Sequence, residues 1–206
     1  MIEIIQGSPE WFAARCGKVT ASRVADIIAK TKTGPSASRE NYLAQLVCER
    51  MTGKPAESYS NAAMAWGTEQ EPFARAAYES AKDILVQEVG FVVHPLIEDA
   101  GASPDGLVGL FGLVEIKCPN TATHIQTLLD QKVPEKYNTQ MQWQMACTQR
   151  QWCDFVSFDP RMAEGLQIFI KRVEFDPIYV AQLEKEVINF LMDVEEKIQK
   201  LNKLKD

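Results

Sequence analysis

A change in hydrophobic spacing near Asp83 is the feature that most constrains the fold of this chain. Before it, apolar residues recur at helical spacing, and after it residues 85–117 alternate as in β-strands. The later segments are helices at about 121–131 and 137–150, strands at 154–158 and 166–175, and a long amphipathic helix over 177–204. This order predicts an α/β fold, with a mixed central β-sheet flanked by helices, in a single domain spanning residues 1–206.

Local signals place the first helices. Ser8 and Pro9 are typical of a helix start, and a second helix is expected to open at Thr20-Ala21-Ser22. A turn-rich loop over 31–38 and a helix over 41–51, stopped by Gly53, come next. The helical stretch 62–81 contains Gly67 and Pro72, which predict a break or a true start near Thr68. The strand-like segments 85–94, 100–103 and 107–117 are expected to form a three-strand meander, with GLFG as a hairpin turn.

Composition narrows the functional classes. The net charge of −6 does not favour nucleic-acid binding, yet residues 1–54 carry eight basic and only five acidic side chains. With only two histidines, a His-rich zinc hydrolase or an HNH-type nuclease is not expected. Five scattered cysteines, no apolar run of membrane-spanning length and no signal-peptide pattern lead us to expect a cytoplasmic protein with no membrane partner.

The most informative segment is Ser103-Pro104-Asp105-Gly106 followed by Glu115-Ile116-Lys117. Side chains at i and i+2 of a strand share a face, so Glu115 and Lys117 should emerge together. Asp105 begins the opposing arm of the hairpin and can lie beside them. Two carboxylates are the ligands that Mg²⁺ prefers, and Lys117 could orient an attacking water or stabilise developing charge. The alternative is a common Pro-Asp-Gly turn with a solvated Glu-x-Lys pair.

Two helical features could extend this patch. Glu69 and Glu71 occupy the first turn of a helix, where acids also act simply as partners of the helix dipole. Gln140 and Gln144 lie one turn apart, and a glutamine there could support a metal-bound water or merely form a polar helix face.

A third feature suggests a phosphate site. Arg15 and Lys18 precede the expected helix start at Thr20-Ala21-Ser22, and hydroxyls and amides at a helix start bind phosphate well. The alternative is plain N-capping by Thr20 or Ser22.

An ordered set of motifs carries a family resemblance from Trp11 to Met162. The motifs are WFAARCGKVTAS, AWGTEQE, SPDGL, EIKCP, YNTQMQWQM and FVSFDPRM. In them the chain resembles the phage lambda-type exonucleases, a viral recombination branch of the PD-(D/E)xK nuclease superfamily. The resemblance implies a restriction-endonuclease-like core with an N-terminal helical region that binds DNA ends. It explains the long C-terminal helix least.

The resemblance also implies roles for individual residues. Asp105, Glu115 and the backbone carbonyl of Ile116 would hold metal, and Lys117 would act on the nucleophilic water. Glu71 matches an upstream acid near a second metal site. Gln140 matches the family's helix glutamine. Arg15 and Ser22 match the two residues that bind the terminal 5′-phosphate, and Met64 matches the apolar wedge that separates the strands.

The activity implied by the resemblance is a Mg²⁺-dependent 5′-to-3′ exonuclease, with two ions per active site and Mn²⁺ as a substitute. It would digest one strand of linear duplex DNA with a 5′-phosphorylated end to 5′-mononucleotides, leaving a 3′ single-stranded tail for recombination. The protein would assemble as a homotrimeric ring, and its partner would be a single-strand annealing recombinase. Two alternatives stay open: a structure-specific PD-(D/E)xK endonuclease, and a catalytically silent DNA-end-binding module.

Overall fold

The computed structural model describes residues 4–32, 34–56 and 62–205. The N-terminal elements are α1 (Pro9–Arg15), β1 (Val19–Thr20), the 3-10 helix η1 (Ala21–Arg23), α2 (Val24–Ile28), β2 (Lys30–Thr31), β3 (Gly34–Pro35), α3 (Ala37–Thr52) and α4 (Ala62–Lys82). The strands β4 (Val86–Gln87), β5 (Val92–Val93), β6 (Ala100–Ala102), β7 (Gly106–Val108) and β8 (Gly112–Lys117) follow. The chain ends with α5 (Thr121–Asp130), α6 (Glu135–Thr148), β9 (Trp152–Phe158), β10 (Ile168–Glu174) and α7 (Pro177–Asn202).

A five-stranded sheet in the order β10-β9-β8-β7-β4 forms the centre of the fold. Strands β8 and β9 are parallel and the other neighbours are antiparallel, so the predicted mixed sheet is confirmed. The parallel register places Glu115 beside Phe155 and Lys117 beside Ser157. The charged pair of the motif therefore lies near the C-terminal end of the central strand β8.

Alternation along β8 gives the sheet two different faces. Val114 and Ile116 pack with Ala74 and Tyr78 of α4 in one apolar cluster. Leu113 packs with Met141 and Met145 of α6 in another. Helices therefore cover both faces of the sheet, and Glu115 lies on the face covered by α6.

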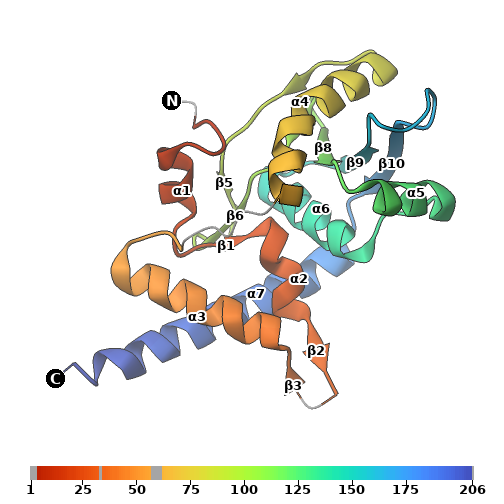
Figure 1. The fold of residues 1–206 in the computed structure, drawn as a ribbon. Coiled ribbons are helices and arrows are strands. Elements are labelled where there is room, and N and C mark those ends of the chain that lie inside the picture. The colour runs from red at the N-terminus through yellow and green to blue at the C-terminus, as the bar shows by residue number, and fades with distance from the viewer. Residues whose placement is uncertain (1–3, 33, 57–61, 206) are drawn as a thin grey trace.

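A second core supports the N-terminal helices. In Figure 1, α3 and α7 cross below the small sheet β1-β6-β5, and residues of both helices share one buried cluster. Tyr42 of α3 stacks on Phe190 of α7 with ring centroids 5.4 Å apart. Trp143 and Cys147, on the far side of α6, join the same cluster. Helix α6 thus links the N-terminal helices to the central sheet.

Most predicted helix boundaries are confirmed. Ser8 caps α1 by accepting a hydrogen bond from the Trp11 amide, and Gly53 ends α3 in the left-handed region at φ 67°. The second helix begins with η1 at Ala21, but the side chain of Thr20 makes no capping bond. Within the expected loop 31–38, a small β2-β3 hairpin forms and α3 already begins at Ala37; residue 33 lies outside the described residues.

Two predictions were wrong. Helix α4 continues through Pro72, because Pro72 removes only one helical N–H while Ala74 and Tyr78 beyond it are fully buried. The three-strand meander does not form either. Strand β6 pairs with β1 and β5, whereas β7 pairs with β4 and β8. The parallel partner of β6 lies far away in the sequence, so local spacing could not reveal it.

No helix in the described ranges has the length and apolar content needed to cross a lipid bilayer.

Candidate active site

The carboxylate of Glu115 is the most tightly held group of the motif. Its residue is 0% exposed, and Lys117 forms an ion pair with Oε1. Gln140 Nε2 donates to Oε1 and Gln144 Nε2 to Oε2, both at 2.6 Å. Glu115 and Lys117 therefore share one face of β8, as their spacing predicts, and two turns of α6 fix the position of the carboxylate.

Asp105 lies directly beside this pair. The Ile116 amide donates to its Oδ2 over 2.6 Å, which joins the start of β7 to the end of β8. Burial, and then the negative charge of Glu115, raise the pKa of Asp105 well above its ordinary value. Burial lowers the pKa of Lys117, but Glu115 and Asp105 outweigh it and raise that pKa. Lys117 is therefore a charged ammonium at neutral pH.

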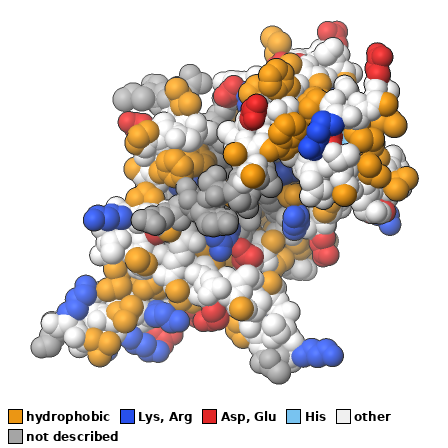
Figure 2. All heavy atoms as spheres, in the orientation of Figure 1, with side chains coloured by type: hydrophobic (Ala, Val, Ile, Leu, Met, Phe, Trp, Pro, Cys, Tyr) orange, Lys and Arg blue, Asp and Glu red, His pale blue; other side chains and the backbone are white. Residues whose placement is uncertain are grey.

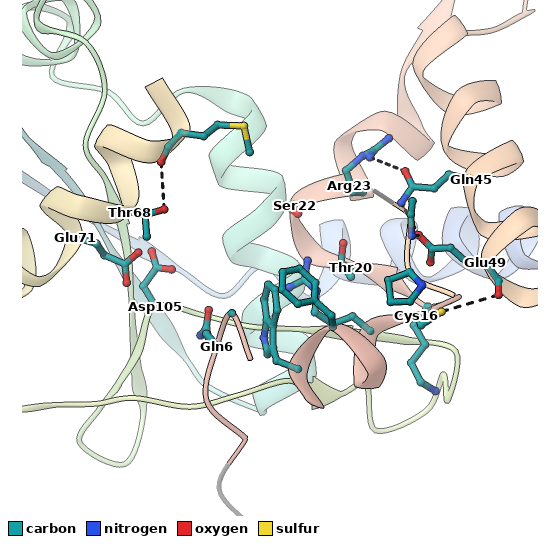
Figure 3. A pocket seen from close by; sticks show the side chains of 18 of the residues that line it. Gln6, Cys16, Thr20, Ser22, Arg23, Gln45, Glu49, Thr68, Glu71 and Asp105 are labelled. Atoms are coloured by element: carbon teal, nitrogen blue, oxygen red, sulfur yellow. Dashed lines mark hydrogen bonds between the residues drawn. The ribbon is translucent and has the colours of Figure 1, made fainter. Parts of the chain in front are cut away.

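Glu71 of α4 is a second acid close to Asp105. Figure 3 shows the two side chains pointing toward one another, and the charge of Glu71 adds to the raised pKa of Asp105. Arg75 holds Glu71 with Nη2 2.9 Å from Oε1. Glu69, the neighbouring acid in the sequence, is exposed and does not line the cavity described next.

Asp105 and Glu71 line a cavity of about 970 Å³. The other predicted residues that line it are Arg15, Ser22 and Met64. Glu115, Lys117 and Gln140 are not in its lining. In Figure 3 the two acids occupy one side of the cavity, and Arg23, Gln45 and Glu49 the other.

Ser103 connects the basic side of the cavity to the acidic side, and the sequence analysis missed it. Its Oγ accepts from Trp11 Nε1 at 2.9 Å and from Arg15 Nη1 at 3.4 Å. The Arg15 guanidinium also lies 3.8 Å from the centroid of the Trp11 ring. Because Ser103 precedes Pro104-Asp105, α1 is attached to the segment that carries Asp105. Its position in the SPDG motif was the available signal.

Two of the remaining predicted residues occupy exposed positions. Ser22 is exposed on η1, and Met64 is 52% exposed near the start of α4. The metal-binding role of the Ile116 carbonyl stays a prediction.

The donor chemistry of the site fits a hard cation. Within the described residues, no three His, Cys, Asp or Glu side chains stand together as a complete metal site. Asp105 and Glu71 nevertheless converge. Burial raises the pKa of Asp105 most, and the negative charges of Glu115 and Glu71, which a cation would compensate, raise it further. Carboxylate oxygens with room for water suit Mg²⁺, which binds few protein ligands.

Basic side chains are scattered over one face of the molecule (Figure 2). On the face shown in Figure 2, Lys and Arg stand in separate places rather than in one patch. Arg15 and Arg75 line the same cavity as Asp105 and Glu71. An anionic substrate would therefore be recognised within the cavity more than on this outer face.

Comparisons with known proteins find similar sequences and structures. A model described as the YqaJ-like viral recombinase domain matches residues 10–151. An alkaline exonuclease from Laribacter hongkongensis is 53% identical, with a TM-score of 0.89 over 95% of this chain and 97% of that one. Its complex with dAMP has a TM-score of 0.90 at 54% identity, over the same shares of the two chains.

A more distant structure shares the fold. A phage-related exonuclease from Haemophilus somnus has a TM-score of 0.72 at 15% identity, covering 89% of this chain and 96% of that one. No curated protein matches the sequence.

Proposed function

The chain belongs to the YqaJ-like viral recombinase family, and from this premise we propose that it is a Mg²⁺-dependent exonuclease that digests duplex DNA from its 5′ ends. At the coarser level it is a phage-type exonuclease, since the similar Laribacter hongkongensis protein is an alkaline exonuclease. Metal, polarity and product are the finer proposals.

One observation carries the proposal: a carboxylate and ammonium cluster adjoins a cavity that an arginine also lines. Asp105, Glu115 and Lys117 form the cluster, and Arg15 lines the cavity that Asp105 enters. A phosphodiester at Asp105 would thus lie in the same cavity as a cation that is able to bind a terminal phosphate.

The contacts of each residue indicate its role in the proposed reaction. Asp105, Glu115 and Glu71 would hold Mg²⁺, together with the Ile116 carbonyl, and Mn²⁺ could replace it. When bound, such ions supply an activated water and balance charge on the phosphodiester oxygens. Because its pKa is raised, Lys117 would orient the water and stabilise charge as an ammonium rather than take a proton. Gln140 and Gln144 keep Glu115 in place.

Three further residues that line the cavity would select the DNA end. Arg15 and Ser22 would bind the terminal 5′-phosphate, and Met64 would act as a wedge between the strands. A relative that binds dAMP, a nucleoside monophosphate, supports mononucleotides as the product. The opposite strand would remain as a 3′ tail.

The assembly belongs to the same proposal. A homotrimeric ring would retain the duplex during successive cuts, as closed cyclic symmetry allows. A single-strand annealing recombinase would receive the 3′ tail.

The test compares linear duplex DNA with a covalently closed circle, in Mg²⁺ or EDTA, with Asp105→Asn as the inactive variant. We expect Mg²⁺-dependent release of mononucleotides from linear DNA only. Cleavage of the circle would support the structure-specific endonuclease instead. Binding without cleavage of either substrate would support the silent end-binding module.

A further inference from the structure

The loop between Arg15 and Ser22 is held by a pair of adjacent charged residues that the proposed mechanism does not use. Glu49 and Arg50, in the last turns of α3, contact the two sides of Gly17. Glu49 is only 6% exposed, although its side chain is a carboxylic acid. A buried carboxylate is costly unless it is fully hydrogen-bonded, so its partners indicate what it is kept for.

Glu49 accepts bonds from two backbone amides and one side chain. Oε2 accepts from the Gly17 amide at 2.7 Å. Oε1 accepts from Gln45 Nε2 at 2.8 Å and from the Ala56 amide at 3.1 Å. The carboxylate is thus satisfied mainly by fixing backbone, and its shortest bond is to the loop that follows Arg15.

Arg50 holds the same residue from its carbonyl side. Its Nε donates to the Gly17 carbonyl at 2.8 Å, and its Nη2 lies 3.0 Å from Oδ2 of Asp99. Gly17 has φ +71°, and a Cβ added there would lie 2.8 Å from Cγ of Arg50. The loop can therefore approach Arg50 this closely only with glycine at position 17.

The position of Gly17 determines the position of its neighbours. The Lys18 amide donates to the Arg15 carbonyl at 3.0 Å, which closes a turn around Gly17. The Val19 amide donates to the Asp99 carbonyl at 2.8 Å, and β1 then leads directly into η1 and Ser22. The position of Gly17 is thus constrained, and Gly17 lies in the sequence between Arg15 and Ser22, the two residues assigned to the terminal phosphate.

We propose that Glu49 and Arg50 are positioning residues for 5′-phosphate recognition: by holding Gly17 they set the placement of Arg15 and Ser22. This inference rests on the proposed function, because it gives a role to Glu49, which lines the same cavity, and to its neighbour Arg50. Neither residue needs to touch the DNA.

The test measures discrimination between two DNA ends without cleavage. A hairpin duplex carrying either a 5′-phosphoryl or a 5′-hydroxyl end is bound in EDTA and followed by fluorescence anisotropy. The readout is the ratio of the two dissociation constants. A variant that merely loses stability weakens binding to both ends alike and leaves this ratio unchanged.

Glu49→Gln keeps the shape of the side chain and removes its charge. We expect it to lower the discrimination ratio roughly tenfold, as for a weakened charge-assisted hydrogen bond, with affinity for the hydroxyl end kept within about twofold. Glu79→Gln is the matched control, because Glu79 is also a helix glutamate that accepts from a backbone amide. It lies near the C-terminal end of α4 and accepts from the Val86 amide at 2.7 Å. Its ratio should equal that of the unmodified protein.

An unchanged ratio in Glu49→Gln overturns the inference. If that variant fails to fold, Arg50→Met tests the same loop from the carbonyl side, with the same expected loss and the same contrary result. Arg15→Ala separates the two levels of the account. If Arg15→Ala abolishes discrimination while both positioning variants retain it, the phosphate pocket is supported and the inference is wrong. If Arg15→Ala also retains discrimination, the assignment of the phosphate pocket is itself wrong.

Discussion

Gln144 donates a 2.6 Å hydrogen bond to Oε2 of Glu115, one helical turn beyond the matching bond from Gln140 to Oε1. Helix α6 thereby sets the orientation of a carboxylate that is completely buried in the sheet. The geometry of the acidic centre depends on this contact between helix and strand as much as on the motif itself.

Gln144→Leu should therefore destabilise the protein. It leaves one oxygen of a buried carboxylate without its donor, a loss of about 1–3 kcal/mol in the free energy of unfolding. Urea denaturation measures the change. Gln126→Leu, which removes an exposed bond to Asp130 on α5, is the control and should change the free energy far less. Equal losses would show that the bond to Glu115 carries no special weight.

Lys117→Met should abolish most of the activity. The ammonium is the cation paired with Glu115, and removing one such charged donor from an active site typically costs about 10²–10³ in kcat. Turnover on linear duplex DNA in Mg²⁺ measures the effect. Lys171→Met on β10 replaces an exposed lysine in the same way and should leave turnover intact. An active Lys117→Met enzyme would remove this residue from the chemistry.

Arg15→Ala should reduce kcat/KM for 5′-phosphorylated duplexes much more than for 5′-hydroxyl duplexes. A lost charged hydrogen bond to the phosphate corresponds to roughly ten- to a hundredfold. Steady-state kinetics on the two substrates give the two values. Lys54→Ala, an exposed cation after α3, should affect both substrates equally and little. Equal losses on both ends in Arg15→Ala would contradict the phosphate assignment.

Acid stability should depend on the Asp159 and Arg161 pair beyond β9. Burial acts to raise the pKa of Asp159, but hydrogen bonds from Arg161 and Thr121 outweigh it and lower the pKa to about 2. The unfolded pKa is about 3.9, so the stabilisation is complete above that pH and is lost as the pH falls toward 2.

Arg161→Ala should raise this pKa and move the midpoint of acid unfolding to higher pH. Circular dichroism during an acid titration measures the midpoint. In the control variant Lys171→Ala the midpoint should stay in place. A midpoint that does not move in Arg161→Ala would show that Asp159 does not set the acid limit.

The sequence was most informative where a residue's role is local. The capping role of Ser8, the helix end at Gly53 and the shared face of Glu115 and Lys117 all follow from spacing within a few residues. The approach of Asp105 to the pair was also predictable, since one hairpin joins them.

Contacts between distant segments could not be predicted in this way. The bond from Trp11 to Ser103 and the pairing of β1 with β6 join residues that are far apart in the chain. Glu49 gave no signal at all, because an acid on a helix ordinarily faces solvent. Only the packing of α3 against the loop at Gly17 shows that this acid is buried and bonded to backbone.

Strand polarity tests the central claim most directly. A linear duplex with a 5′-phosphate on one strand only and a 5′-hydroxyl on the other is digested in Mg²⁺, and both strands are followed separately with time. The account predicts that the phosphorylated strand is shortened from its 5′ end to mononucleotides while its complement stays at full length. Digestion of both strands at equal rates, or shortening from the 3′ end, would contradict it.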